Sequence, residues 1–384
     1  MKSSLQFIDE RKRISRDHVY LSASFSKPHT VHLDASTVCQ LKCPTCPNAT
    51  GNVKRGIGSG FLRFDDFKKF IDSHPWVSHI ELSNWGEIFL NPELHDIIQY
   101  GYERNIALSA KNGANFNDVS EDVLEALVKY KFRFLTCSLD GASQTVYSVY
   151  RVNGNFDSVI NNIEKLNGYK KKHRSSYPFL TWQFIPFRHN EGDIGKARKM
   201  SKQLNMNFKL KLSWDDLYTD SFSPIINKSL IRKESGLGVA NREEYENKYG
   251  TSYISQTCCH LWINPCINHD GRLLGCTVNH WGDFGNVFER GLEDCLNSEA
   301  VKYAKQMLLG TKQAREGIPC SECKIYEQMK ERNSWVRLTP LHTKIIGRQT
   351  LRMLTNVINN RLPPSLVRAL ARQLNLIKRI RNVL

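Results

Sequence analysis

Six β-rich runs alternate with helical patterns over the first 215 residues, and this alternation limits the folds open to the chain. The segments between the runs carry apolar residues at helical spacing, such as Phe64, Phe67, Phe70 and Ile71. Alternating β and α elements form parallel sheets. The pattern predicts an α/β fold, either a partial (β/α)6 barrel like part of a TIM barrel or a flatter doubly wound sheet. The six runs are residues 29–36, 77–85, 105–112, 132–140, 179–187 and 207–214.

Unusual residues follow each of the first four runs. A cysteine-rich loop comes after the first, Trp85-Gly86-Glu87 closes the second, and Asn-Gly and Asp-Gly pairs follow the third and fourth. The carboxyl ends of parallel strands build the active site in βα architectures. Asn-Gly and Asp-Gly are also ordinary turn dipeptides. Their joint placement nevertheless predicts that all four segments meet at one mouth.

The cysteine loop holds Cys39, Cys43 and Cys46 at the spacing C-x3-C-x2-C, with no fourth cysteine or histidine nearby. The first residues contain no apolar signal-peptide core, and no apolar run is long enough to cross a bilayer. A cytoplasmic location is expected, where clustered cysteines indicate metal or redox chemistry. Three thiolates on a four-iron cluster leave one iron open to bind a small molecule. The alternative is a zinc or structural cluster completed by a distant residue.

The stretch "CQLKCPTCP" resembles the loop of the radical S-adenosylmethionine (SAM) enzymes, and the resemblance extends from about residue 30 to 215. It implies that the three thiolates hold a 4Fe-4S cluster whose open iron binds SAM. "NWGEIFLNPEL" resembles the family's glycine-glutamate motif, with Trp85 in place of its first glycine, and Thr45 stands where an aromatic residue is common. By the same resemblance, Gly86 and Glu87 contact the SAM amino group, Asn112 and Ser138 its ribose side, and Arg151 its carboxylate.

A second region, residues 251–330, holds seven of the eleven cysteines and follows a polar linker at 216–250. It resembles the SPASM or twitch extension of radical SAM enzymes, which implies one auxiliary 4Fe-4S cluster. A zinc site is the alternative. Cys259 is an alternative to Cys258 as ligand, and three further thiols are expected to be buried and inert. The implied ligands are Cys258, Cys276, Cys320 and Cys323, and the inert thiols are Cys137, Cys266 and Cys295.

The net charge of +16 is concentrated at the C-terminal end, where residues 332–384 contain eleven Lys and Arg and no Asp or Glu. Residues 365–384 place leucines and isoleucines on one helical face and basic residues mostly elsewhere. Such a basic tail, taken as residues 331–384, fits three uses. It can lie peripherally on an anionic membrane surface. It can also cover the protein's own core or a partner, and nucleic acid is the least favoured use.

The resemblance implies reductive cleavage of SAM and hydrogen abstraction from a carbon centre, ending in oxidation or epimerisation. An electron donor such as flavodoxin or ferredoxin is implied as a partner. Only about 30 residues, residues 1–30, precede the first run, which leaves no room for a leader-peptide domain there and favours a carbohydrate, a nucleotide sugar or another small molecule. A peptide-modifying maturase, an RNA-modifying enzyme and a non-enzymatic iron–sulfur carrier remain alternatives. No acid or base can be assigned from the sequence.

Overall fold

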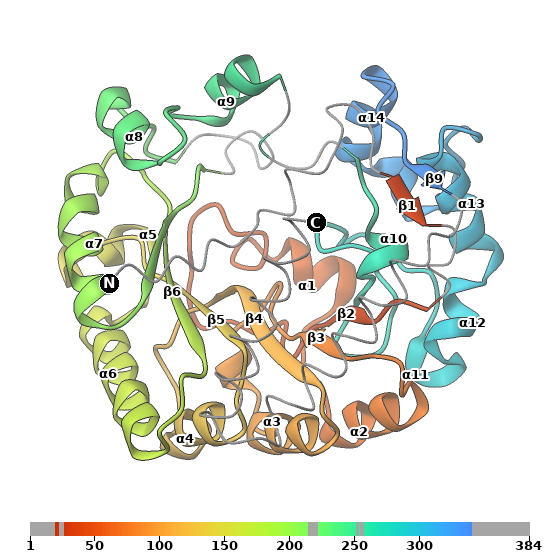
Figure 1. The fold of residues 1–384 in the computed structure, drawn as a ribbon. Helices are drawn as coiled ribbons and strands as arrows, with labels where there is room; N and C mark the ends of the chain where they lie inside the picture. The colour runs from red at the N-terminus through yellow and green to blue at the C-terminus, as the bar shows by residue number, and fades with distance from the viewer. Residues whose placement is uncertain (1–19, 23–26, 214–221, 251–252, 254–256, 340–384) are drawn as a thin grey trace, which may run out of the picture.

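A seven-stranded parallel sheet forms the centre of the computed structural model, which describes residues 20–22, 27–213, 222–250, 253 and 257–339 (Figure 1). The strand order is β7-β6-β5-β4-β3-β2-β8, and every neighbouring pair is parallel. The sheet is open between β7 and β8, as in a partial barrel. The strands are β2 (Thr30–Leu33), β3 (His79–Glu81), β4 (Ala107–Ala114), β5 (Phe134–Ser138), β6 (Phe179–Phe184), β7 (Asn207–Leu210) and β8 (Cys266–Ile267).

All six predicted β-rich runs contain a strand of this sheet, and the α/β prediction is confirmed. The seventh strand, β8, comes from the second cysteine-rich region and pairs with β2, His32 opposite Cys266. Sequence patterns did not predict β8, because a strand of two residues is too short to show alternation. Through β8 the second region adds directly to the edge of the central sheet.

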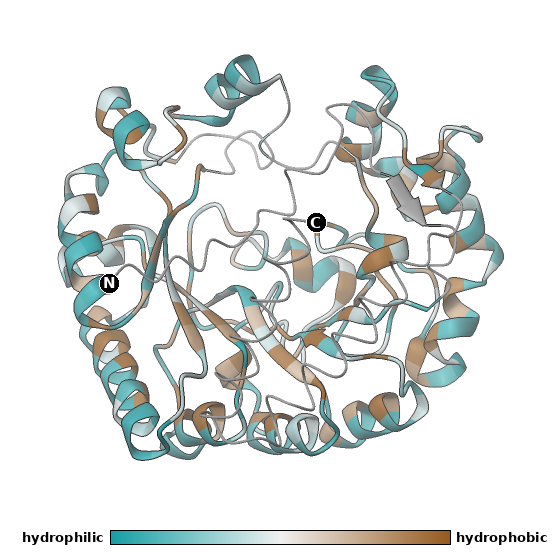
Figure 2. Cartoon of the chain, viewed as in Figure 1, coloured by the Kyte–Doolittle hydropathy of each residue, from teal (hydrophilic) through white to brown (hydrophobic). Residues whose placement is uncertain are grey.

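The helices between the strands cover the outer side of the sheet (Figure 1). Hydrophobic and hydrophilic residues both occur along each of them (Figure 2), and most of the hydrophobic ones are buried. In α2 the buried residues include Phe67, Phe70 and Ile71, as the spacing predicts. These helices are α2 (Phe64–Ser73), α3 (Leu94–Glu103), α4 (Glu121–Lys129), α5 (Gln144–Tyr150), α6 (Phe156–Lys172) and α7 (Ile194–Gln203), with 3-10 turns η2 (Ile88–Leu90) and η3 (Glu191–Asp193).

Short helices make up most of the rest of the described chain. The short helix α1 (Asn52–Ile57) directly follows the cysteine loop, and α8 (Lys228–Glu234) and α9 (Arg242–Tyr249) lie in the predicted linker. A separate two-stranded sheet pairs β1 (Tyr20–Ser22) with β9 (Arg337–Thr339). The second region contains α10 (His260–Ile263), α11 (Val287–Arg290), α12 (Leu292–Leu296), α13 (Glu299–Leu308), η4 (Pro319–Glu322) and α14 (Lys324–Glu331).

The predicted amphipathic helix at residues 365–384 lies outside the described residues. Among the helices in the described ranges, none combines the length and the apolar character needed to cross a membrane.

Candidate active site

The three thiols of the cysteine loop lie just after β2 and share one small apolar cluster. Cys43 is buried there with Leu41, Ile185 and Phe187, and Cys39 and Cys46 pack against it. Burial raises the pKa of Cys39 to about 12, and the nearby charges of Glu87, Cys43 and Cys46 raise it as well. Burial likewise raises the pKa of Cys43. Three crowded thiols in apolar surroundings would ionise readily only with a cationic group to bind the thiolates.

Within the described residues, no three Cys, His, Asp or Glu side chains lie close enough together to hold a single metal ion. A cluster of several irons binds each cysteine through a different iron and so holds its ligands farther apart than one ion does. The chemistry of the thiol set and its apolar surroundings therefore fit such a cluster.

The Trp85-Gly86-Glu87 segment packs directly on the backbone that leads into the cysteine loop. A Cβ atom on Gly86 would lie 2.3 Å from the Ser36 carbonyl oxygen, so only glycine fits. The Glu87 N–H donates to the Val38 carbonyl at 2.8 Å. The Glu87 carboxyl points inward and accepts from the backbone N–H groups of Phe89 at 3.2 Å and Asn115 at 2.5 Å. In this structure Glu87 joins three segments of the site through backbone groups.

Burial of Glu87 raises its pKa to about 7, and the two backbone N–H donors only partly oppose this shift. A carboxyl group with this pKa exchanges protons near neutral pH.

The two residues expected on the ribose side lie at the ends of neighbouring strands. Asn112 projects from β4, where its amide donates to the Ser83 carbonyl at 2.9 Å. Ser138 ends β5 and is buried. Gly113, with φ of 131°, brings the β4 backbone so close that a Cβ there would lie 2.5 Å from Ser138 Oγ. Gly113 therefore keeps Asn112 and Ser138 on adjoining segments.

Arg151 lies at the end of α5 and joins the cysteine loop to the segment that follows β5. Its Nε and Nη2 donate to Asp140 Oδ2 at 2.7 and 2.6 Å, and its Nη1 donates to Cys43 Sγ at 3.7 Å. Burial opposes the charge of Arg151, but the charges of Asp140 and Cys43 together raise its pKa above the usual value. The guanidinium group thus places a positive charge beside a predicted cluster ligand.

Four thiols of the second region line a common apolar pocket: Cys258, Cys276, Cys320 and Cys323. Cys259 is not among the lining residues, although it is adjacent in sequence. Burial raises the pKa of Cys276 to about 11, and the charge of Cys323 adds to this shift. Burial also raises the pKa of Cys258, together with the charges of Cys276 and Cys320. The structure therefore brings together the four thiols expected from the sequence, Cys258 among them, and leaves the alternative Cys259 outside the pocket lining.

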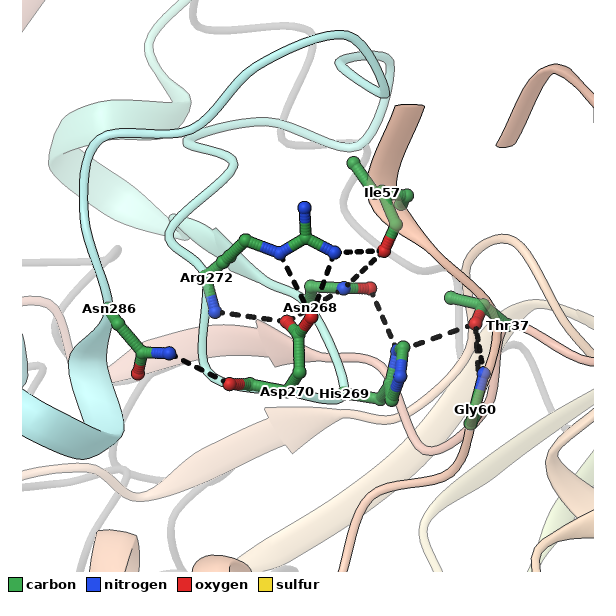
Figure 3. Close-up of polar contacts among 8 residues, drawn as sticks. All are labelled: Thr37, Ile57, Gly60, Asn268, His269, Asp270, Arg272 and Asn286. Carbon is green, nitrogen blue, oxygen red and sulfur yellow. Dashed lines mark hydrogen bonds and ion pairs between the residues drawn. The ribbon is translucent and has the colours of Figure 1, made fainter. Parts of the chain in front are cut away.

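A polar turn connects this second region to the cysteine loop (Figure 3). His269 Nδ1 lies 3.3 Å from Thr37 Oγ1, which also accepts from the Gly60 N–H at 3.0 Å. Asn268 donates to the Ile57 carbonyl at the end of α1 at 3.1 Å. The turn thus holds both sides of the loop that carries Cys39, Cys43 and Cys46.

Solved structures share this architecture. No protein-family model and no curated protein matches the chain. The structure of Streptococcus suis SuiB bound to S-adenosylmethionine has a TM-score of 0.55 and 13% identity, over 79% of this chain and 72% of SuiB. The structure of anSMEcpe with bound AdoMet has a TM-score of 0.51 and 16% identity, over 87% of this chain and 100% of anSMEcpe.

The chain has the fold of the radical SAM enzymes. At these identities the likeness concerns the fold, and it agrees with the partial barrel predicted from the strand pattern. The cysteine loop, the Gly86 segment and Arg151 all lie at the carboxyl ends of the strands in this barrel.

Sequence reasoning missed two polar residues of the site. Asn115 donates to Cys39 Sγ at 3.8 Å and to Gln40 Oε1 at 3.1 Å, and its N–H holds Glu87. Its segment, "SAKNGAN", offered two asparagines, and nothing in the sequence distinguished them. Asp140 was treated only as part of a turn dipeptide, yet it is fully buried and pairs with Arg151. A buried acidic partner for an arginine is a tertiary feature with no local pattern.

Proposed function

We propose that this chain is a radical SAM enzyme that removes a hydrogen atom from a carbon centre of a small molecule. The observation that carries the proposal is the meeting of Cys39, Cys43 and Cys46 with Gly86 and Arg151 at one end of a partial barrel. The three cysteines would hold a 4Fe-4S cluster with one iron open to SAM. When bound, such a cluster supplies the electron that cleaves SAM into methionine and a 5′-deoxyadenosyl radical.

The chain's own residues would position and shield this chemistry. Leu41, Ile185 and Phe187 surround the thiols with apolar side chains that exclude water. Arg151 offsets negative charge on Cys43, and Asp140 fixes its orientation through two hydrogen bonds. Gly86 allows its backbone to approach the cysteine loop, where this segment would orient SAM. Glu87 keeps this backbone in place.

A second 4Fe-4S cluster would bind Cys258, Cys276, Cys320 and Cys323, which share the apolar pocket. Four thiolates would complete the coordination of its irons, which suits electron transfer rather than substrate binding. The pocket residues Leu261, Phe284 and Leu308 keep water from the cluster. An external electron donor of the flavodoxin or ferredoxin class would reduce the enzyme.

Two substrate classes are supported by different observations. The first candidate is a carbohydrate or related small molecule, oxidised or epimerised at one carbon. A peptide is the second candidate, because a structure of SuiB bound to its precursor peptide SuiA shares this fold with a TM-score of 0.51. Deuterated carbohydrates and deuterated peptides would distinguish the two classes, because only a true substrate would transfer deuterium into deoxyadenosine.

The experiment that tests the proposal compares Cys43→Ala with Cys295→Ala after anaerobic reconstitution. Cys43 belongs to the loop, whereas Cys295 is a fully buried thiol of α12 outside both sets. Cys43→Ala should abolish deoxyadenosine formation because one cluster ligand is lost. Cys295→Ala should retain it. Substantial deoxyadenosine from the Cys43 variant would refute the open-iron assignment.

A further inference from the structure

A row of buried polar groups lies where β2 meets β8, on the side of the sheet away from the outer helices. Val31 and Leu33 of β2 belong to the main apolar core, so the alternate residues His32 and Asp34 face the opposite, inner side. Cys266 pairs with His32 across the strands. We call His32, Asp34, Asn264 and Cys266 the inner polar wall.

Asp34 is the most unusual member of this wall. It is 0% exposed, and neither of its carboxyl oxygens has a hydrogen-bond partner within the described part of the chain. Burial raises its pKa well above the usual range, a contact with the Asn84 amide, whose geometry falls short of a full hydrogen bond, partly opposes the shift, and the charge of Glu81 adds to it. Buried carboxyl groups are normally paired or hydrogen-bonded, because an unsatisfied one destabilises the fold.

Glu81 on the adjacent strand shows what a structural carboxyl group looks like in this sheet. It is similarly buried, but it accepts from Ser83 Oγ at 2.7 Å, Ser109 Oγ at 2.5 Å and the Lys111 N–H at 2.6 Å. Three donors satisfy Glu81, whereas in the described residues Asp34 has only the Asn84 amide close to it, at a geometry short of a hydrogen bond. The two acids therefore differ in what the fold provides for them.

Two neighbouring residues of the wall contact each other, and in the described residues each keeps one polar atom without a partner. Asn264 Nδ2 lies 3.2 Å from His32 Nε2, and burial lowers the pKa of His32 to about 3, so its imidazole is neutral. The Asn264 amide donates to Nε2, which leaves the imidazole proton on Nδ1. In the described residues, His32 Nδ1 and Asn264 Oδ1 have no hydrogen-bond partner. Within the described residues, the wall thus holds four polar atoms without a hydrogen-bond partner: both Asp34 carboxyl oxygens, His32 Nδ1 and Asn264 Oδ1.

The wall lies between the two thiol sets. Asn84, in the segment that leads to Gly86, donates to Cys266 Sγ at 3.9 Å. Burial raises the pKa of Cys266, and the charges of Asp34 and Cys276 both contribute. Cys266 therefore lies within electrostatic reach of both Asp34 and Cys276, a thiol of the second cysteine set. A molecule that reacts between the two clusters would contact this wall.

We propose that the inner polar wall binds hydroxyl groups of a polyhydroxylated ligand, with both carboxyl oxygens of Asp34 hydrogen-bonded to them. A hydroxyl group both donates and accepts, so it can satisfy the carboxyl oxygens, His32 Nδ1 and Asn264 Oδ1 alike. The inference rests on the proposed function and specifies its substrate as a sugar or related polyol. The ribose of SAM carries the same chemistry, and the position between the thiol sets favours the substrate.

The first test compares the thermal stability of the full chain with that of Asp34→Asn and the matched variant Glu81→Gln, without clusters or SAM. Glu81→Gln should lower the Tm by several degrees, because an amide cannot accept from all three donors. Asp34→Asn should equal or exceed the wild type. The Tm difference between Asp34→Asn and the wild type should grow from about pH 5 to about pH 8. The pKa of Asp34 is higher in the folded than in the unfolded chain, so the wild type loses stability as the pH rises above the unfolded-state pKa, and the variant does not. A Tm loss like that of Glu81→Gln would overturn the proposal.

The second test uses named probes. Millimolar glucose, glucosamine, myo-inositol and UDP-glucose are titrated into reconstituted wild type and Asp34→Asn, and SAM is titrated separately. At least one polyol should bind the wild type at least tenfold more tightly than the variant, with equal SAM affinity in both. Loss of SAM affinity in the variant would assign the wall to the ribose instead. A wild type that binds none of the polyols would overturn the polyol assignment. The Tm test is run without clusters or SAM, so its result does not depend on whether the protein cleaves SAM.

Discussion

Arg151 Nη1 donates to Cys43 Sγ at 3.7 Å, which ties a buried arginine to the middle cysteine of the loop. The same guanidinium pairs with Asp140, whose side chain is 0% exposed while that of Arg151 is 14% exposed. Asp140 also accepts from the Ile185 N–H at 2.7 Å. A charge network therefore connects the cysteine loop, α5 and the end of β6.

Arg151→Met should destabilise the protein by about 3–5 kcal/mol, because it leaves Asp140 buried without a counter-charge. Urea denaturation of the full chain measures this loss. Adding Asp140→Asn should restore part of it, since the amide still accepts from the Ile185 N–H. Arg315→Met, which breaks an exposed pair with Glu299, should change stability little. An Arg151 variant that behaves like the Arg315 variant would show that the buried pair is not structural.

Gly86→Ala should weaken SAM binding and lower stability by about 1–3 kcal/mol, because its Cβ would lie 2.3 Å from the Ser36 carbonyl oxygen. Calorimetric SAM titration and urea denaturation report the two effects. The control is Gly168→Ala in the middle of α6, where a Cβ meets nothing within 4 Å. That variant should gain about 0.5–1 kcal/mol. Unchanged SAM affinity in Gly86→Ala would exclude a positioning role for this segment.

Cys258→Ala and Cys259→Ala form a matched pair for the second cluster. Cys258 lines the pocket with Cys276, Cys320 and Cys323, and Cys259 does not. Cys258→Ala and Cys320→Ala should lose about four irons and fail to form product while still cleaving some SAM. Cys259→Ala should keep about eight irons. Iron analysis and absorption spectra test this, and the reverse pattern for the doublet would move the ligand to Cys259.

Lys305→Met should stabilise the protein at neutral pH. Burial in α13, beside Trp262, lowers the pKa of Lys305 to about 8. Since this lies below the unfolded value of about 10.5, wild-type stability falls as the pH drops from about 10.5 to about 8. The variant should gain about 1–2 kcal/mol at pH 7 after allowance for partial exposure, and nothing near pH 11.

Denaturation of the Lys305 variant at the two pH values measures this difference. The exposed Lys330→Met of α14 is the control and should change little at either pH. A gain that does not depend on pH would mean that packing, and not the buried charge, limits stability at Lys305.

Much of the fold could be predicted from sequence because βα units carry local patterns. The β-rich runs located six of the seven strands of the central sheet, and the helical spacing located the buried face of α2. The two-residue strand β8 has no such pattern and depends on its pairing with β2.

The candidate site likewise has features that a local sequence pattern predicts and features that depend on tertiary contacts. The cysteine spacings indicated which thiols to group, and the structure gathers each group. The Arg151–Asp140 pair and the unpaired carboxyl of Asp34 depend on tertiary contacts. Residues distant in sequence create these features, so no local pattern could reveal them.

The most direct test of radical SAM chemistry is the formation of 5′-deoxyadenosine from SAM by the reconstituted full chain, under anaerobic conditions with a strong reductant and with iron counted per chain. We expect deoxyadenosine together with about eight irons, four for each cysteine set. A fully loaded protein that neither binds SAM nor forms deoxyadenosine would contradict the assignment of Cys39, Cys43 and Cys46 to a SAM-binding cluster.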